Sequence, residues 1–155
     1  MPDLSDLLRP DAVLTGVSVA SKKALFAQLA AALASQTGGD AKLITERLAA
    51  REKLGSTGFG GGVAIPHGKL DGVEQVTAVF ARLAQPLEFA AVDGVPVDLV
   101  CALLSPTNAG ADHLKALARV SRRLRDRAFL AKLRGAGSPD ALYALFTEDH
   151  ARDAA

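Results

Sequence analysis

One histidine stands out because of the residues that surround it. His67 lies between Pro66 and Gly68, directly after the apolar residues 63–65. Imidazole has an ordinary pKa of about 6.5, so a neutral ring with a nucleophilic nitrogen predominates near pH 7. Such a ring can attack phosphorus and carry a phosphoryl group. A histidine between proline and glycine is also typical of an ordinary turn, so both interpretations stay open at this point.

The segment around this histidine is rich in glycine. Seven of the 14 glycines of the chain lie between residues 55 and 72. Backbone with few side chains can direct several N–H groups at phosphoryl oxygens, which carry nearly two negative charges. A flexible loop of ordinary turn residues explains the same composition equally well. The candidate phosphoryl-binding residues are two hydroxyl side chains and four glycines: Ser56, Thr57, Gly58, Gly60, Gly62 and Gly68.

Two further side chains could complete such a site. Arg51 is predicted in the last turn of a helix that ends at Leu54, and its guanidinium offers a fixed fork of donors. A cation at a helix C-terminus is favourable even without a ligand. His113, at the start of another predicted helix, could donate a hydrogen bond from a second imidazole. By itself, a histidine at such a position is more often a surface residue.

Other phosphate-binding and metal-binding motifs do not fit the sequence. Val63 and Leu70 stand where a P-loop requires glycine and Ser or Thr. Val63 also interrupts the dinucleotide fingerprint, and a nucleophile elbow fails because Gly55 directly precedes Ser56. The three histidines have no metal-ligand spacing, and a single cysteine can form neither an internal disulfide nor a multi-cysteine zinc site. We therefore expect no metal and no cofactor.

Three other features receive structural interpretations. Cys101, in an apolar run, is predicted to fill the core. His150 lies in the polar tail and is expected to be inert. Five arginines form a basic run that is predicted to be a solvated face, with a partner surface or a nucleic-acid patch as the alternative: Arg119, Arg122, Arg123, Arg125 and Arg127.

The composition limits the class of protein. The chain has 155 residues, 49% of them apolar and 23% charged, which predicts one globular domain and excludes a disordered chain. The net charge of +1 predicts no strong attraction to nucleic acid or to a membrane surface. Unbroken aliphatic stretches reach six residues, far too few to span a bilayer, and the first residues are acidic where a signal peptide is basic. The expected location is the cytoplasm.

Helical and strand patterns alternate along the chain. The residues that follow Ser21, Asp40, Asp112 and Ser138 are predicted to be helical, with these four residues as N-caps. The predicted helices cover residues 21–36, 41–54, 112–125, 128–133 and 138–146. The predicted strands cover residues 63–65, 76–83 and 97–104. Helices before, between and after strands indicate an α/β sandwich around one sheet, whose strand order does not follow from the pattern.

Residues 48–58 and 64–70 closely resemble the enzyme IIA domains of the bacterial phosphoenolpyruvate-dependent phosphotransferase system. The resemblance is to the fructose/mannitol type and, within it, to the nitrogen-regulatory branch, which Lys69 and the single domain favour. It continues through residues 89–100, 102–104 and 112–114 and covers almost the whole chain. It implies an α/β sandwich with a mixed sheet, an enzyme IIA type-2 domain over residues 1–147 and a polar C-terminal tail over residues 148–155.

The resemblance also implies a function for the candidate residues. His67 would receive the phosphoryl group from a small phosphocarrier protein, HPr or its nitrogen-branch relative NPr, and Arg51 and His113 would share the active site. We expect Nε2 to be the nucleophile while the other ring nitrogen donates to a fixed acceptor. The phosphorylation state would then regulate partner proteins, such as potassium-transport or sensor-kinase systems.

Two alternatives stay open. The first is an enzyme IIA for sugar uptake, which would pass the phosphoryl group to an enzyme IIB. The second, from another class, is a module that binds a small molecule or nucleotide and is never phosphorylated.

Overall fold

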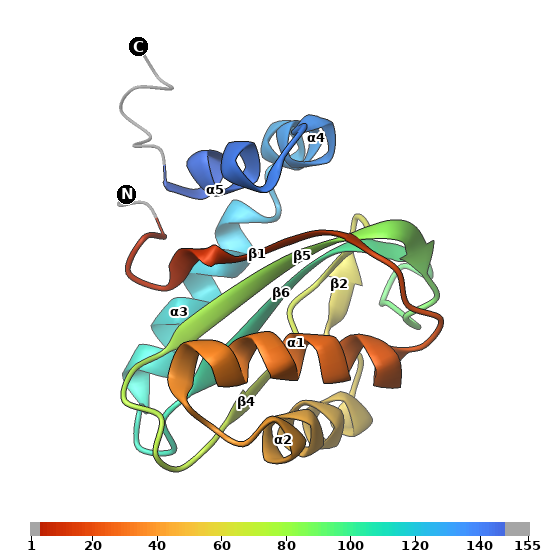
Figure 1. Ribbon diagram of the computed structural model, residues 1–155. Coiled ribbons are helices and arrows are strands. Elements are labelled where there is room, and N and C mark those ends of the chain that lie inside the picture. Colours follow the sequence, from red (N-terminus) through yellow and green to blue (C-terminus); the bar gives the residue numbers. More distant parts are fainter. Residues whose placement is uncertain (1–3, 148–155) are drawn as a thin grey trace.

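The computed structural model describes residues 4–147, which form one mixed sheet between two layers of helices (Figure 1). The strand order is β1-β5-β6-β3-β2, and the short strand β4 also pairs with β6. β1 is parallel to β5, β5 is antiparallel to β6, and both β3 and β4 run parallel to β6. The six strands of this described part are β1 Leu8–Val17, β2 Gly58–Gly60, β3 Val63–Ala64, β4 His67–Lys69, β5 Thr77–Leu87 and β6 Val97–Ser105.

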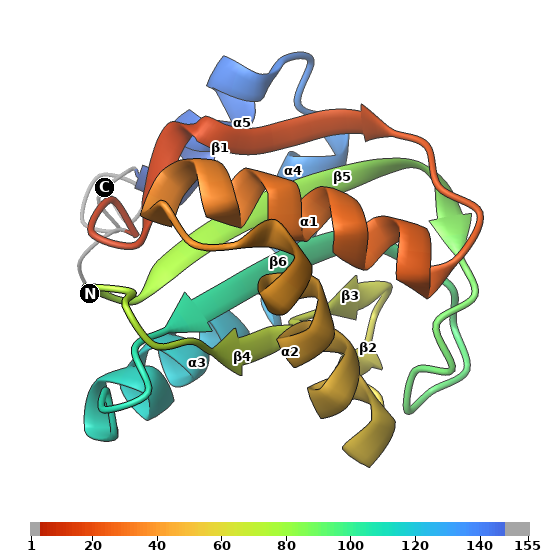
Figure 2. The same cartoon turned by 60° about the horizontal axis from the view of Figure 1, so that its bottom comes forward.

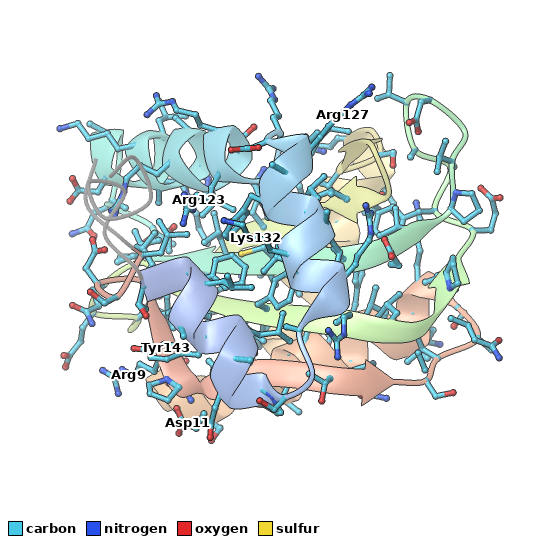
Figure 3. All side chains as sticks on the ribbon, turned by 90° about the horizontal axis from the view of Figure 1, so that it is seen from above. Arg9, Asp11, Arg123, Arg127, Lys132 and Tyr143 are labelled. Atoms are coloured by element: carbon cyan, nitrogen blue, oxygen red, sulfur yellow. The ribbon has the colours of Figure 1, made fainter. Side chains whose placement is uncertain are left out.

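The helices lie on both faces of the sheet. α1 and α2 cover one face, and α2 contacts β4 (Figure 2). α3, α4 and α5 lie in front of the opposite face (Figure 3). The sandwich expected from the sequence pattern is therefore confirmed, and the sheet is mixed. The five helices of the described residues are α1 Lys22–Thr37, α2 Ala41–Leu54, α3 Ala111–Arg123, α4 Arg127–Gly135 and α5 Pro139–Thr147.

The central strand explains why one sheet can support two helical layers. Eight of the nine residues of β6 are buried, as its apolar sequence predicts for a strand covered on both faces. On the side of α4 and α5, the ring of Phe146 packs against Phe80 and Phe129 with centroid distances of 4.8 and 5.4 Å. Edge-to-face and tilted rings at such distances attract each other beyond the area that they bury. These rings thus join α4 and α5 to the central strand β5.

Three of the four predicted N-caps are confirmed. The side chains of Ser21, Asp40 and Ser138 accept hydrogen bonds from backbone N–H groups two or three residues ahead. The prediction for Asp112 was wrong: α3 begins at Ala111, and its N-cap residue is Gly110. Asp112 lies in the first turn instead, where a carboxylate is favourable to the helix dipole.

The sequence pattern did not predict β1, β2 or β4. Pro10 interrupts the alternation in β1, and it is tolerated because β1 is an edge strand that pairs only with β5 within the described sheet. β5 extends to Leu87, past the predicted end at Leu83, because an irregular register between Arg82 and Leu87 accommodates Pro86. β2 and β4 have three residues each, too few to show a period.

Candidate active site

Two imidazole rings meet at the edge of the sheet. His67 is the first residue of β4, opposite Leu103 of β6, and His113 lies in the first turn of α3. The ring centroids are 5.7 Å apart. Side chains alternate along a strand, and a Cβ atom on Gly68 would lie 3.1 Å from Cβ of Arg47 in α2. Gly68 therefore faces α2, and His67 points to the other side, toward α3.

The backbone determines which nitrogen of His67 carries the proton. Nδ1 lies 2.8 Å from the carbonyl oxygen of Ile65. A carbonyl oxygen can only accept, so Nδ1 carries the hydrogen and Nε2 presents a lone pair. Nε2 has no hydrogen-bond partner among residues 4–147. The expectation of a fixed acceptor for one ring nitrogen is confirmed.

Both rings are held in the neutral form at pH 7. Burial lowers the pKa of His67, and the nearby guanidinium of Arg51 lowers it further, whereas the hydrogen bond to Ile65 and the carboxylate of Glu52 oppose this change. Burial also lowers the pKa of His113, and His67 and Lys69 add to the effect. A neutral His67 keeps the lone pair that a nucleophile needs.

Arg51 lies close to His67 at the C-terminal end of α2. Its Nη1 atom donates to the carbonyl oxygen of Gly55 at 2.9 Å, which holds the side chain against the turn that follows the helix. A guanidinium has five N–H donors in a fixed plane, so most of them remain for an anion. The two imidazole rings therefore lie together, and the charge of Arg51 acts on His67.

Glu52 is a site residue that the sequence analysis missed. Its side chain is 7% exposed, and its carboxylate accepts hydrogen bonds from the backbone N–H of Thr57 at 3.2 Å and from the Oγ1 hydroxyl of Thr57 at 2.6 Å. It also pairs with Nζ of Lys22 at 2.8 Å. These bonds fasten the turn after α2 to the helix that carries Arg51. A glutamate next to an arginine gives no signal of burial, so only the structure reveals this contact.

Ser56, Thr57 and Gly58 lie in this turn and already have partners. The hydroxyl of Ser56 donates to the carbonyl oxygen of Phe89 and accepts from the N–H of Gly58, while Thr57 is bound to Glu52. A Cβ atom on Gly58 would lie 2.9 Å from Cβ of Ala91, so glycine is needed there for close packing. These contacts give each of the three residues a structural role in the turn.

Gly60 and Gly62 are not brought to His67. They lie at the turn between β2 and β3, where φ is +116° at Gly60 and +81° at Gly62. Val63, which follows this turn, is opposite Leu99, whereas His67 is opposite Leu103. Four residues of strand correspond to about 13 Å. The two glycines serve a tight turn with positive φ, which glycine adopts without steric cost.

Three further features named in the sequence analysis are Cys101, the possible metal ligands and His150. Cys101 is buried, and burial raises the pKa of its thiol to about 12, so its assignment to the core is confirmed. Within residues 4–147 no group of three or more possible ligands for a metal lies together, and no helix is long and apolar enough to cross a membrane. His150 lies outside the described residues.

The basic run is more than the solvated face that the sequence predicts. Arg119 pairs with Asp6 at 2.8 Å. Arg123, between α3 and α4 in Figure 3, lies over the ring of Phe129 at 4.0 Å and donates to the carbonyl oxygen of Leu145. These two arginines therefore connect α3 to neighbouring elements, and the prediction was wrong for them.

Comparison with known proteins adds independent evidence. Residues 6–149 match the family described as "Phosphoenolpyruvate-dependent sugar phosphotransferase system, EIIA 2". A nitrogen regulatory protein of Bradyrhizobium diazoefficiens is 49% identical over 142 residues, which cover 92% of this chain and 93% of that protein. A nitrogen regulatory protein of Pseudomonas aeruginosa is 42% identical over 147 residues, covering 94% and 95%.

Solved structures show the same fold. The crystal structure of nitrogen regulatory protein IIA-Ntr from Neisseria meningitidis has a TM-score of 0.88 and 37% identity, and the match covers 93% of this chain and 99% of that one. IIA mannitol from Escherichia coli has a TM-score of 0.75 at 20% identity, covering 89% and 97%, and thus supports the fold alone. The chain belongs to the EIIA 2 family of the phosphoenolpyruvate-dependent sugar phosphotransferase system, as an enzyme IIA of the nitrogen-regulatory type.

Proposed function

We propose that Nε2 of His67 accepts a phosphoryl group from the phosphohistidine of a small phosphocarrier protein, HPr or NPr, and that the phosphorylated and free forms act differently on partner proteins. One observation carries the assignment to Nε2. The carbonyl oxygen of Ile65, 2.8 Å from Nδ1, keeps the proton on that nitrogen and leaves the Nε2 lone pair without a partner in the described chain.

The bonds and charges of the transfer balance with only the donor and His67. The Nε2 lone pair forms a bond to phosphorus while the N–P bond of the donor breaks, and that electron pair stays on the donor nitrogen. Nδ1 of His67 keeps its proton and goes on donating it to the carbonyl oxygen of Ile65, so the ring gains a formal positive charge beside the phosphoryl oxygens. This charge offsets part of the negative charge and keeps the group easy to pass on.

Arg51 and His113 are suited to bind the moving group. A loose transition state spreads negative charge over three equatorial oxygens, and donors that are already in place stabilise it without reorganisation. Arg51 is close enough to His67 to lower its pKa, and the His113 ring is 5.7 Å away. We assign both residues to the phosphoryl-binding site.

Exposed apolar side chains beside these residues offer a docking surface for the carrier. Leu54, at the end of the helix that carries Arg51, is 84% exposed, and Leu114, next to His113, is 66% exposed. Burial of such side chains stabilises a protein complex. A phosphoryl group adds up to two negative charges to this surface, so a regulated partner can distinguish the two states by charge.

The test of this function is labelling with phosphoenolpyruvate, enzyme I and a purified carrier, followed by intact mass. We expect one acid-labile phosphate on the wild-type chain, none on His67→Ala, and full labelling of His150→Ala, the matched control. Stoichiometric labelling of a folded His67→Ala chain would refute the assignment. Rapid onward transfer to a sugar-specific enzyme IIB would contradict a regulatory role.

A further inference from the structure

A buried hydroxyl contacts the second imidazole from inside the protein. Ser105, the last residue of β6, is fully buried, and its Oγ atom lies 2.6 Å from Nδ1 of His113. Its backbone is held by the strand that carries His67, because Lys69 lies opposite Ser105 and the N–H of Leu70 donates to its carbonyl oxygen. One ladder of hydrogen bonds therefore positions both the nucleophile and this hydroxyl.

The hydroxyl leaves two arrangements open to His113. Nδ1–H can donate to Oγ, in which case Nε2 presents a lone pair; or the hydroxyl can donate to Nδ1, in which case Nε2 carries the hydrogen. Nε2 of His113 has no partner within residues 4–147. Phosphoryl oxygens on the neighbouring His67 would repel a lone pair and accept from an N–H group. They would therefore select the second arrangement.

We propose that Ser105 is a positioning residue for phosphoryl transfer: its hydroxyl donates to Nδ1 of His113 and thereby directs the Nε2–H of a neutral imidazole at the phosphoryl group on His67. The inference rests on the function proposed above. It assigns opposite tautomers to the two rings. A carbonyl oxygen forces Nδ1–H on His67, and a hydroxyl permits Nε2–H on His113.

A neutral donor suits a reversible relay. A second imidazole whose Nδ1 faced an acceptor, as that of His67 does, could donate from Nε2 only by taking up a proton and becoming a cation. That cation would bind the phosphorylated state more tightly than the transition state requires, and tight binding of a product slows the next transfer. The lowered pKa of His113 fits the neutral form.

The direct test needs no substitution. Nitrogen-15 NMR of the histidine rings in the wild-type protein, free and phosphorylated by the carrier, distinguishes Nδ1–H, Nε2–H and imidazolium. We expect His113 to be neutral with Nε2–H in the phosphorylated protein. A His113 with Nδ1–H, or an imidazolium at pH 7.5, would overturn the proposal.

Variants test the role in transfer. Ser105→Ala is expected to slow phosphorylation by the carrier about tenfold, the usual scale for one lost hydrogen bond, and to shift the nitrogen-15 resonance of Nδ1 of His113, which loses the hydroxyl that donates to it. Ser105→Thr, which keeps the hydroxyl, should restore both. The matched control is Thr77→Val, which removes another buried hydroxyl, one that donates to the carbonyl oxygen of Gln75.

The outcomes separate this inference from the proposed function. If wild-type His67 is labelled but Ser105→Ala shows the wild-type Nδ1 resonance of His113 and the wild-type rate, the inference fails and the function stands. If Thr77→Val slows transfer as much as Ser105→Ala, the effect is one of stability and the inference also fails. If a folded His67→Ala chain is labelled, the proposed function itself fails.

Discussion

At the scale of single residues, the two imidazoles differ through the atoms behind them. His67 faces a carbonyl oxygen, which can only accept, and His113 faces a hydroxyl, which can also donate. The sequence identified both rings and Arg51, because their residue types and motif are visible in the chain. It could not identify Glu52 or Ser105, because nothing in a sequence tells a buried glutamate or serine from an exposed one.

Burial of the two imidazole rings predicts how the activity of the site depends on pH. Because burial lowers the pKa of both rings, each should titrate with an NMR midpoint below the ordinary value of 6.5. Protonation removes the Nε2 lone pair of His67, so the rate of phosphorylation should be level near pH 7 and fall as the pH drops through that lowered midpoint. A midpoint above 6.5 would contradict the neutral site.

The effect of His67 on the pKa of His113 can also be tested. His67 contributes to the lowered pKa of His113, so His67→Ala should raise the NMR midpoint of His113. The control is Arg9→Ala, on β1, which should leave that midpoint unchanged. An unchanged midpoint in His67→Ala would mean that the two rings do not interact in solution.

At the scale of elements, α2 and the turn after it bring Arg51 to the site. The helix could be predicted because Asp40 caps it and its apolar residues recur with a helical period. The conformation of the turn could not, because it depends on Glu52, which binds Thr57 in the turn and Lys22 in α1. The short strands β2 and β4 likewise depend on pairing partners that lie far away in the sequence.

Glu52→Ala should therefore destabilise the protein. It leaves the N–H of Thr57 without its partner and removes the ion pair of Lys22, which together should cost about 2–4 kcal/mol in the free energy of unfolding. Urea unfolding measures this cost. Glu46→Ala, an exposed glutamate of the same helix, is the control and should change stability by less than about 0.5 kcal/mol. Equal effects of the two variants would show that the buried network contributes nothing.

At the scale of the whole molecule, the sandwich follows from the alternation of apolar elements. The nearly continuous apolar run of β6 indicates a strand covered on both faces, and helices must supply that cover. The strand order could not be predicted, because β1 shows no clear alternation and pairs with β5, more than 60 residues away. That pairing places the first described residues beside the last helix, α5, which contacts β1.

Phe146 connects the last described helix to the core and to the first described residues. Phe146 is fully buried against Phe80 and Phe129, and its carbonyl oxygen accepts from the N–H of Leu4 at 3.1 Å. A chain shortened to end at Thr147 keeps all of these contacts. We therefore expect removal of residues 148–155 to change the free energy of unfolding by less than about 0.5 kcal/mol and to leave labelling intact.

Phe146→Ala is the contrasting change at the same end of the chain. It removes a ring that joins α5 to α4 and β5, so it should cost about 3–5 kcal/mol in urea unfolding. The difference between the two variants locates the boundary of the domain. If the chain that ends at Thr147 were destabilised as strongly as Phe146→Ala, the domain would have to extend past residue 147, and the proposed boundary between residues 147 and 148 would be wrong.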